Sequence, residues 1–313
     1  MSSSEQAIGD VPPVPFELLL AYPGGLSPSQ VSVDFQEAYD RIPHPEVVLE
    51  SSIDEIWGQR VQRNPSLYNG KKFRYAGYAA HTGGSDSNQV SRVTLHLGLT
   101  DYRTFVGTNL NPLWESFLVP SEDDVTRCKH TSSPLGNGAI VETSDGKIIV
   151  LRRSNNVGEF PGHYVFPGGH PEPEEVGISS HPPIESLVDF ETNRKLADEM
   201  FDSIFREVVE EIGVPSTSLG DATFIGVSRR KLNVRPTAFF FMKCCLHSDE
   251  VRRCYSTAQD GYESTQLFSV PLIELMDLAP KMPGCHQGGF ALYQLMLQYN
   301  KQERLMLISN PEK

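Results

Sequence analysis

The segment from Arg206 to Val214, Arg-Glu-Val-Val-Glu-Glu-Ile-Gly-Val, carries the residues best suited to chemistry in this chain. Its glutamates, Glu207, Glu210 and Glu211, stand at positions i, i+3 and i+4, which are neighbours on one face of a helix. Like charges at these spacings oppose helix formation by roughly 0.2–0.5 kcal/mol per pair. A divalent cation among them would reverse that effect, since Mg²⁺ takes carboxylate oxygens in octahedral geometry. The segment therefore indicates either a magnesium site or a solvated acidic face.

A helix that begins near Asp198 is predicted to carry these glutamates. Apolar residues recur through it at three- and four-residue steps and so share another face. They are Met200, Phe201, Ile204, Phe205, Val208, Val209 and Ile212. Gly213 is a suitable C-cap, and Pro215 prevents continuation of the helix.

A second segment, residues 166–175, contains a Gly-Gly pair within Phe-Pro-Gly-Gly-His-Pro-Glu-Pro-Glu-Glu. With residues 206–214 it resembles the two halves of the Nudix box, in which G-x5-E precedes R-E-U-x-E-E-x-G-U and U is apolar. Gly169 and Glu175 match the first half. The family places seven residues between that Glu and the Arg, whereas thirty stand between them here. We therefore predict an insertion, and residues 176–197 have the mixed polar composition of a surface loop.

This resemblance implies both a fold and a set of roles. The fold is an α/β/α sandwich with a mixed sheet. Glu207 and Glu211 would be the direct Mg²⁺ ligands, one helical turn apart, whereas Glu210 would bind a second metal, hold a water or act as a base. Arg206 joins these catalytic residues in a role that orients a glutamate rather than contacting substrate. Such a site neutralises a diphosphate and activates water for attack on phosphorus.

Three more segments, residues 97–109, 151–154 and 167–173, are similar to the Nudix motif 22 proteins. These are UDP-glucose and UDP-galactose pyrophosphatases with an N-terminal domain ahead of the Nudix fold. The resemblance implies Mg²⁺-dependent hydrolysis of UDP-sugars to UMP and a sugar 1-phosphate. Two alternatives stay open: a Nudix pyrophosphatase for a compound of the ADP-ribose or coenzyme A type, and a non-catalytic nucleotide-sugar-binding protein.

The same resemblance implies substrate contacts outside the box. Tyr68 and Tyr102 would face the uracil, because an aromatic ring stacks on a base and a phenol bonds to its edge. The alternative for each tyrosine is to fill a core. Arg153 would direct its guanidinium fork at a phosphate, or else lie on the surface.

Further contacts would come from the Gly-Gly loop and from scattered positions. By resemblance, His170 would donate to a phosphate or sugar oxygen, and Glu172 would accept from sugar hydroxyls; the alternative for both is a solvated loop. Gly158, Val165 and Cys285 would contribute backbone or van der Waals contacts.

The composition limits the partners and the compartment. A net charge of −13 argues against binding to nucleic acid or to an anionic membrane. The first residues lack the basic flank and apolar core of a signal peptide, and no apolar run approaches twenty residues. The five cysteines show no zinc spacing and suit a reducing compartment. We expect an intracellular protein, cytoplasmic or nucleoplasmic and not secreted, with no obligate protein partner.

The chain divides into three parts in this interpretation. Residues 1–15, rich in Ser and Pro, are expected to be disordered. Residues 16–118 are expected to form a smaller N-terminal α+β domain, and residues 119–313 the Nudix domain. Ser52 and Glu55 have the spacing of a capping box, which predicts a helix that begins there.

Strand patterns are predicted in both larger parts. Residues 16–22 read as a short strand, and residues 73–80 and 90–97 as a hairpin. Residues 138–143 and 148–153 flank an Asp-Gly turn, which is a strong hairpin signal.

Overall fold

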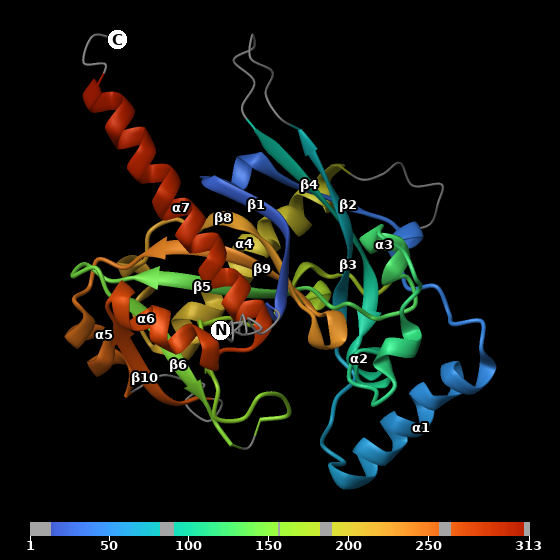
Figure 1. The fold of residues 1–313 in the computed structure, drawn as a ribbon. Coiled ribbons are helices and arrows are strands. Elements are labelled where there is room, and N and C mark those ends of the chain that lie inside the picture. Colours follow the sequence, from blue (N-terminus) through green and yellow to red (C-terminus); the bar gives the residue numbers. More distant parts are fainter. Residues whose placement is uncertain (1–13, 82–90, 156, 182–189, 257–263, 310–313) are drawn as a thin grey trace, which may run out of the picture.

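The computed structural model describes residues 14–81, 91–155, 157–181, 190–256 and 264–309. Its strands form a seven-stranded sheet and a three-stranded sheet, with helices around them (Figure 1). The strands are β1 (Phe16–Leu26), β2 (Val31–Phe35), β3 (Lys71–His81), β4 (Arg92–Asp101), β5 (Gly136–Glu142), β6 (Ile148–Arg153), β7 (Tyr164–Val165), β8 (Thr223–Arg230), β9 (Pro236–Lys243) and β10 (Ser264–Val270). The helices are α1 (Val47–Arg63), α2 (Tyr102–Gly107), α3 (Asp124–Arg127), α4 (Phe190–Ile212), α5 (Ser248–Tyr255), α6 (Leu272–Leu278) and α7 (Gly284–Ser309).

The large sheet is mixed and lies between two helical layers. Its strand order is β1-β8-β9-β5-β6-β10, with β7 paired to β6, and β5 runs parallel to β9 while the other pairs are antiparallel. Successive residues of β5 point to opposite faces: Ala139 and Val141 join the apolar cluster that contains α4, whereas Ile140 joins the one that contains α7. The predicted α/β/α sandwich with a mixed sheet is therefore confirmed.

The small sheet contains the predicted β3–β4 hairpin and a strand that the sequence interpretation missed. β2 pairs in parallel with the outer side of β4. Its residues Val31, Val33 and Phe35 are buried, and they alternate with more exposed ones. The tip of the predicted hairpin, residues 82–88, and the first 13 residues lie outside the described part of the chain.

The first strand belongs to the large sheet, contrary to the expected boundary at residue 16. β1 extends to Leu26, beyond the predicted end at residue 22, and pairs antiparallel with β8. The reason is its apolar content: Leu20 and Leu26 are buried in the main core. From Phe16 the chain thus runs through the large sheet, leaves it for the small sheet, and returns at β5.

The glutamate-bearing helix is longer than predicted. α4 begins at Phe190, so the predicted loop at residues 176–197 contains the start of this helix, and it follows directly on a short 3-10 turn, Pro173–Val176. The apolar stripe continues upstream through Leu196 and Ala197, which are buried. Residues 182–189 of the expected loop lie outside the described part.

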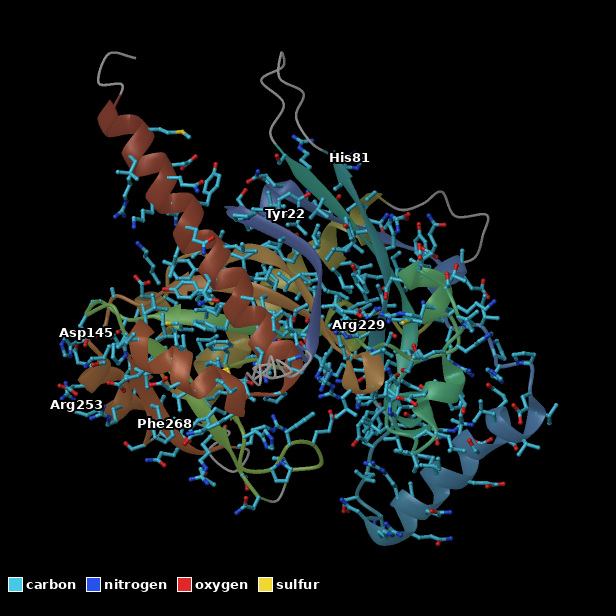
Figure 2. All side chains as sticks on the ribbon, viewed as in Figure 1. Tyr22, His81, Asp145, Arg229, Arg253 and Phe268 are labelled. Carbon is cyan, nitrogen blue, oxygen red and sulfur yellow. The ribbon has the colours of Figure 1, made fainter. Side chains whose placement is uncertain are left out.

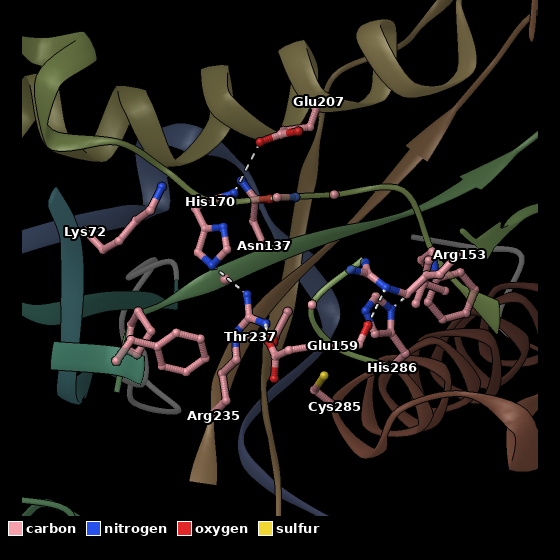
Figure 3. A pocket seen from close by; sticks show the side chains of 18 of the residues that line it. Lys72, Asn137, Arg153, Glu159, His170, Glu207, Arg235, Thr237, Cys285 and His286 are labelled. Carbon is pink, nitrogen blue, oxygen red and sulfur yellow. Dashed lines mark hydrogen bonds and ion pairs between the residues drawn. The ribbon is translucent and has the colours of Figure 1, made fainter. Parts of the chain in front are cut away.

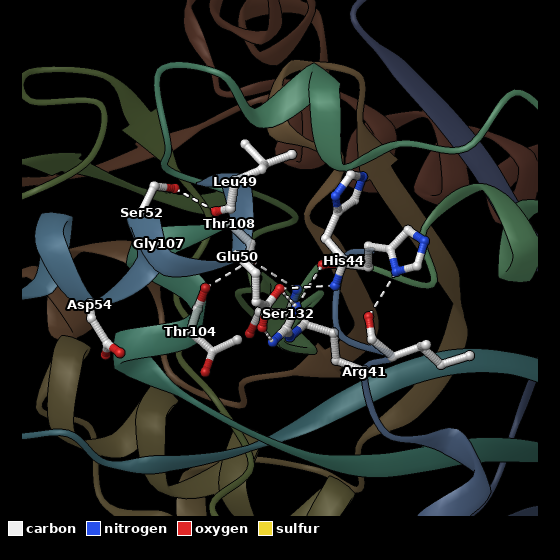
Figure 4. A network of polar contacts seen from close by, with 12 residues as sticks. Arg41, His44, Leu49, Glu50, Ser52, Asp54, Thr104, Gly107, Thr108 and Ser132 are labelled. Atoms are coloured by element: carbon white, nitrogen blue, oxygen red, sulfur yellow. Dashed lines mark hydrogen bonds and ion pairs between the residues drawn. The ribbon is translucent and has the colours of Figure 1, made fainter. Parts of the chain in front are cut away.

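Helix α1 begins at Val47, five residues before the predicted cap. The Ser52 hydroxyl donates to the carbonyl of Leu49, 2.7 Å away, inside the helix. Glu50 in the first turn accepts hydrogen bonds from the Arg41 guanidinium and from the His44 backbone (Figure 4). These contacts favour the earlier start, since a carboxylate in the first turn is stabilised by the helix dipole.

The two sheets share one core. Buried residues of the small sheet, such as Phe73 and Leu97, belong to the same cluster as Met200 and Val208 of α4. Between the sheets, the buried Arg229 of β8 forms an ion pair with Asp124 of α3 (Figure 2). The small sheet is therefore packed against the large one as part of a single hydrophobic unit. None of the described helices is long and apolar enough to cross a membrane.

Candidate active site

A cavity of about 420 Å³ lies where the small sheet meets the carboxylate face of α4. Its wall combines residues of β3, α2, β5, α4 and the start of α7, together with the loops before β7 and after it (Figure 3). Of the predicted site residues, Tyr102, Arg153, Gly158, Val165, His170, Glu172, Glu207, Glu211 and Cys285 line it. Tyr68, Arg206 and Glu210 do not.

Glu207 and Glu211 hold the Gly-Gly loop against α4. Glu207 Oε1 accepts the backbone N–H of His170 at 3.2 Å, and Glu211 Oε2 accepts that of Gly168 at 2.7 Å. A side chain at position 169 would overlap the Glu207 carboxylate, which explains the glycine there. The loop thus approaches the helix as closely as backbone allows.

Asn137 of β5 fixes the same loop from the sheet side. Its backbone N–H donates to the Gly169 carbonyl at 3.0 Å, and its Oδ1 accepts the Gly169 N–H at 2.7 Å. Its Nδ2 donates to the Ser203 hydroxyl of α4 at 2.9 Å. The loop is therefore held by the strand and the helix together.

Arg206 does not line the cavity, but it contacts a residue that holds the loop at the cavity wall. Its guanidinium pairs with Glu199 at 2.8 and 3.2 Å, and this hydrogen-bonded pairing raises the pKa of Arg206. Glu199 is 3% exposed, and its Oε1 also accepts the backbone N–H of Glu172 at 3.2 Å. Arg206 therefore stabilises a buried carboxylate that holds the end of the loop. The sequence interpretation missed Glu199, although its spacing of seven residues from Arg206 is two helical turns.

The middle of the cavity has a chain of charged groups. Glu159 lies between Arg230 and Arg235; burial raises its pKa, but the two guanidiniums outweigh burial and hold the pKa below its usual value. Arg235 Nη2 lies 2.5 Å from His170 Nε2, which must accept because a guanidinium only donates. Burial, then Arg235, Lys72 and Arg153, lower the pKa of His170 well below its usual value. His170 is therefore neutral, with its proton on Nδ1.

The aromatic part of the wall comes from α2. Asp101 caps this helix and accepts the Thr104 N–H at 2.7 Å. Tyr102 lies edge-on to Trp57 at 5.9 Å, and the Arg235 guanidinium lies over the Phe105 ring at 5.4 Å. Because Arg235 precedes β9, this stacking joins the small sheet's helix to the large sheet.

Tyr68 lies apart from this aromatic group. Its side chain is 71% exposed, and its hydroxyl donates to Glu174 at 3.1 Å. The Glu174 contact places it at the 3-10 turn after the Gly-Gly loop, on the outside of the cavity wall.

Several lining residues were not predicted from the sequence. They are Lys72, Phe105, Asn137, Glu159, Arg235, Thr237 and His286. Lys72 forms an ion pair with Glu172 and fixes that carboxylate at the cavity edge. Arg153 Nε donates to the Glu159 carbonyl at 3.0 Å, so both arginines of the cavity are oriented by one residue.

Comparison with known proteins identifies the family. Nudix hydrolase 9 of Arabidopsis thaliana is 62% identical over 290 residues, covering 92% of this chain and 93% of the relative. This chain belongs to the Nudix hydrolase family. Uridine diphosphate glucose pyrophosphatase NUDT22 of Bos taurus is 32% identical to this Nudix hydrolase over 288 residues, covering 88% of the chain and 95% of the relative.

Two other comparisons are more limited. No family model matches this Nudix hydrolase. A solved MutT protein from Methanosarcina mazei Go1 is 19% identical and aligns with a TM-score of 0.34, covering 53% of this chain and 94% of that chain.

The Nudix resemblance implies a metal, and two carboxylates of this Nudix hydrolase fit one. No group of three or more His, Cys, Asp or Glu side chains among the described residues is arranged to hold a metal ion by itself. Glu207 and Glu211, however, face the cavity one turn apart. A pair suits Mg²⁺, which is usually bound by one or two carboxylates together with substrate phosphates and water. Glu210 does not line the cavity, so the three predicted ligands do not converge there.

Proposed function

We propose that this Nudix hydrolase cleaves the diphosphate of UDP-sugars, UDP-glucose and UDP-galactose, to UMP and a sugar 1-phosphate, with Mg²⁺ as cofactor. One observation carries the proposal: a single cavity has the paired carboxylates of α4 on one wall and the aromatic side chains of α2 on another. The relative from Bos taurus, which is named a uridine diphosphate glucose pyrophosphatase, supports the same substrate class.

The reaction centre would be the carboxylate wall. Glu207 and Glu211 would hold Mg²⁺, which when bound neutralises a diphosphate and activates water for attack on phosphorus. The guanidinium of Arg235 supplies fixed positive charge, and the neutral His170 offers an Nδ1–H donor. Because the loop is held by backbone hydrogen bonds, these groups need little reorganisation when charge develops.

The uridine would lie at the small-sheet end of the cavity. Tyr102 and Phe105 offer ring faces and edges for the base. Glu172 belongs to the same end, because its partner Lys72 lies on β3 opposite Thr100, two residues before Tyr102. We assign Glu172 to the ribose hydroxyls, and Arg153, at the opposite end in Figure 3, to the sugar-bearing phosphate.

The test is a hydrolysis screen of UDP-glucose, UDP-galactose, ADP-ribose and coenzyme A, with Mg²⁺ or with EDTA. We expect UMP to form from the two UDP-sugars in Mg²⁺ alone. Activity that survives EDTA would contradict the metal assignment. Hydrolysis of ADP-ribose or coenzyme A without hydrolysis of UDP-sugars would replace the proposed substrates with compounds of the ADP-ribose or coenzyme A type. UDP-sugar binding without turnover of any compound would establish the non-catalytic alternative.

A further inference from the structure

His286 stands in the first turn of α7 with its ring fixed in one orientation. Its Nδ1 lies 3.2 Å from the Phe166 backbone N–H, which donates to it. The ring packs against Phe166 at 6.0 Å and edge-on to Phe239 at 5.7 Å between centroids. A nitrogen that accepts a backbone hydrogen bond carries no proton, so in the neutral ring the proton is on Nε2.

The surroundings keep this ring neutral. Burial, then the charges of Arg153, Arg235 and Arg230, lower the pKa of His286 to about 3. At neutral pH the side chain is therefore a fixed N–H donor without charge. No described residue accepts a hydrogen bond from Nε2, and His286 lines the cavity next to Cys285 (Figure 3).

The position of His286 indicates what it would bind. It lies at the Arg153 end of the cavity, away from Lys72. The nearby arginines favour an anion at this end. A neutral donor can add a hydrogen bond to that anion without adding a like charge to the arginines, and hydrogen bonds to charged acceptors are the stronger ones.

We propose that His286 is a substrate-binding residue whose Nε2–H donates to an oxygen of the distal phosphate of a nucleoside diphosphate, the phosphate that carries the sugar. This assignment rests on the proposed function for the orientation of the substrate. Arg153 and His286 then bind the same phosphate from one side, while Glu207 and Glu211 face the diphosphate from α4.

Two substitutions separate the two ring nitrogens. His286→Asn keeps an acceptor where Nδ1 stands, and so can keep the Phe166 contact, but it lacks the Nε2–H. His286→Gln places an amide N–H where Nε2 stands. We would measure the dissociation constants of UDP and UMP by calorimetry in Mg²⁺ for the wild type and both variants. UMP is the matched probe, because it lacks the distal phosphate.

His286→Asn should weaken the binding of UDP by about tenfold and that of UMP much less. His286→Gln should recover most of the lost UDP affinity. Unchanged UDP affinity in His286→Asn would overturn the proposal, and so would equal losses on UDP and UMP. Equal losses of UDP affinity in both variants would show that the imidazole ring, and not the Nε2–H donor, supports UDP binding, and would overturn the proposal. UDP-glucose turnover by the wild type is scored separately: its absence, with the UDP pattern intact, would overturn the proposed reaction but not the role of His286.

Discussion

The two sides of the cavity are held together in different ways. On the loop–helix wall, formed by residues 166–172 and the glutamates of α4, carboxylates accept backbone N–H groups of an adjacent loop. On the bridging wall, formed by Tyr102, Phe105, Glu159 and Arg235, side chains from three separate segments meet through an ion pair and a cation–ring contact. The first wall is a compact motif, whereas the second exists only because the two sheets pack together.

This difference indicates that the two walls have different roles. The loop–helix wall presents carboxylates at fixed positions, which suits the chemistry common to any diphosphate. The bridging wall presents aromatic rings and a guanidinium, which suit recognition of what is attached to the diphosphate. Substitutions in the first wall should therefore lower turnover of every substrate, and substitutions in the second should change substrate choice.

Deletion of the small sheet would not separate these roles. A chain that starts near Pro134 would lack β1, which forms one edge of the large sheet, and also the buried Leu20 and Leu26. Burial of a leucine side chain contributes about 1.5–3 kcal/mol. Such a deletion would disturb folding as well as binding, so single substitutions are the appropriate tools.

The largest effect is expected on the loop–helix wall. Glu207→Gln and Glu211→Gln should each lower kcat for UDP-glucose by about 10²-fold or more, on the order of 3 kcal/mol in activation free energy. The amide oxygen can still accept the loop N–H, so the melting temperature should not fall. Steady-state kinetics in Mg²⁺ and thermal melting check both parts.

Glu210→Gln is the matched control for these two variants. Glu210 is on the same helix and carries the same charge, but it does not line the cavity. Its substitution should leave kcat near the wild-type value. A loss as large as that of Glu207→Gln would restore Glu210 to the reaction centre as a ligand or base.

A smaller effect is expected from the ion pair behind the same wall. Arg206→Ala leaves Glu199, 3% exposed, without its cation, and should lower stability by about 1–2 kcal/mol, a modest cost because Arg206 itself is 40% exposed. Because Glu199 holds the Glu172 backbone, kcat/KM should fall about tenfold.

The double variant Arg206→Ala with Glu199→Gln tests this route. A glutamine oxygen can still accept the Glu172 N–H and leaves no buried charge unpaired. The double variant should therefore be more stable and more active than Arg206→Ala alone. Additive losses in melting temperature and kcat/KM would instead mean that Arg206 acts independently of Glu199.

The contrast between the walls also explains what could be predicted from the sequence. Glu207 and Glu211 on one helix face, and His170 beside the Gly-Gly pair, are predictable because each half of the motif is a short contiguous segment, and the resemblance of the two halves to the Nudix box implies the sandwich. Arg235 and Glu159 were missed because neither has a local pattern. Their partnership depends on β9, the loop before β7 and α2 meeting in space.

Two long-range pairings were not predicted, for a similar reason. β1 was assigned to the N-terminal unit because it precedes that unit in sequence, yet its partner β8 lies some 200 residues later in the chain. The carboxylate that pairs with Arg206 is Glu199, which follows the predicted insertion at residues 176–197 and has no place in the motif. Counting residues along the sequence cannot locate a partner when the inserted segment itself forms part of a helix.

The smallest effect is expected on the bridging wall, in base choice. A site that forms polar contacts with the pyrimidine edge leaves its own groups unpaired when the base is wrong. We therefore expect kcat/KM for UDP-glucose to exceed that for ADP-glucose by at least about 10²-fold. Equal values in the wild type would remove the uridine preference from the proposed function.

Tyr102→Ala should reduce this ratio of kcat/KM values by about fivefold, mainly by weakening the binding of UDP-glucose. An aromatic contact to a base contributes about 1–3 kcal/mol, and the Tyr102 ring is already packed against Trp57. Tyr102→Phe keeps the ring and removes the hydroxyl, so it shows whether stacking or a hydrogen bond reads the base. Arg153→Ala is the control from the other end of the cavity. Because both substrates carry the same diphosphate, kcat/KM should fall equally for UDP-glucose and ADP-glucose, and their ratio should not change. A ratio that stays constant in Tyr102→Ala but falls in Arg153→Ala would reverse the proposed orientation of the substrate, with the base at the α7 end.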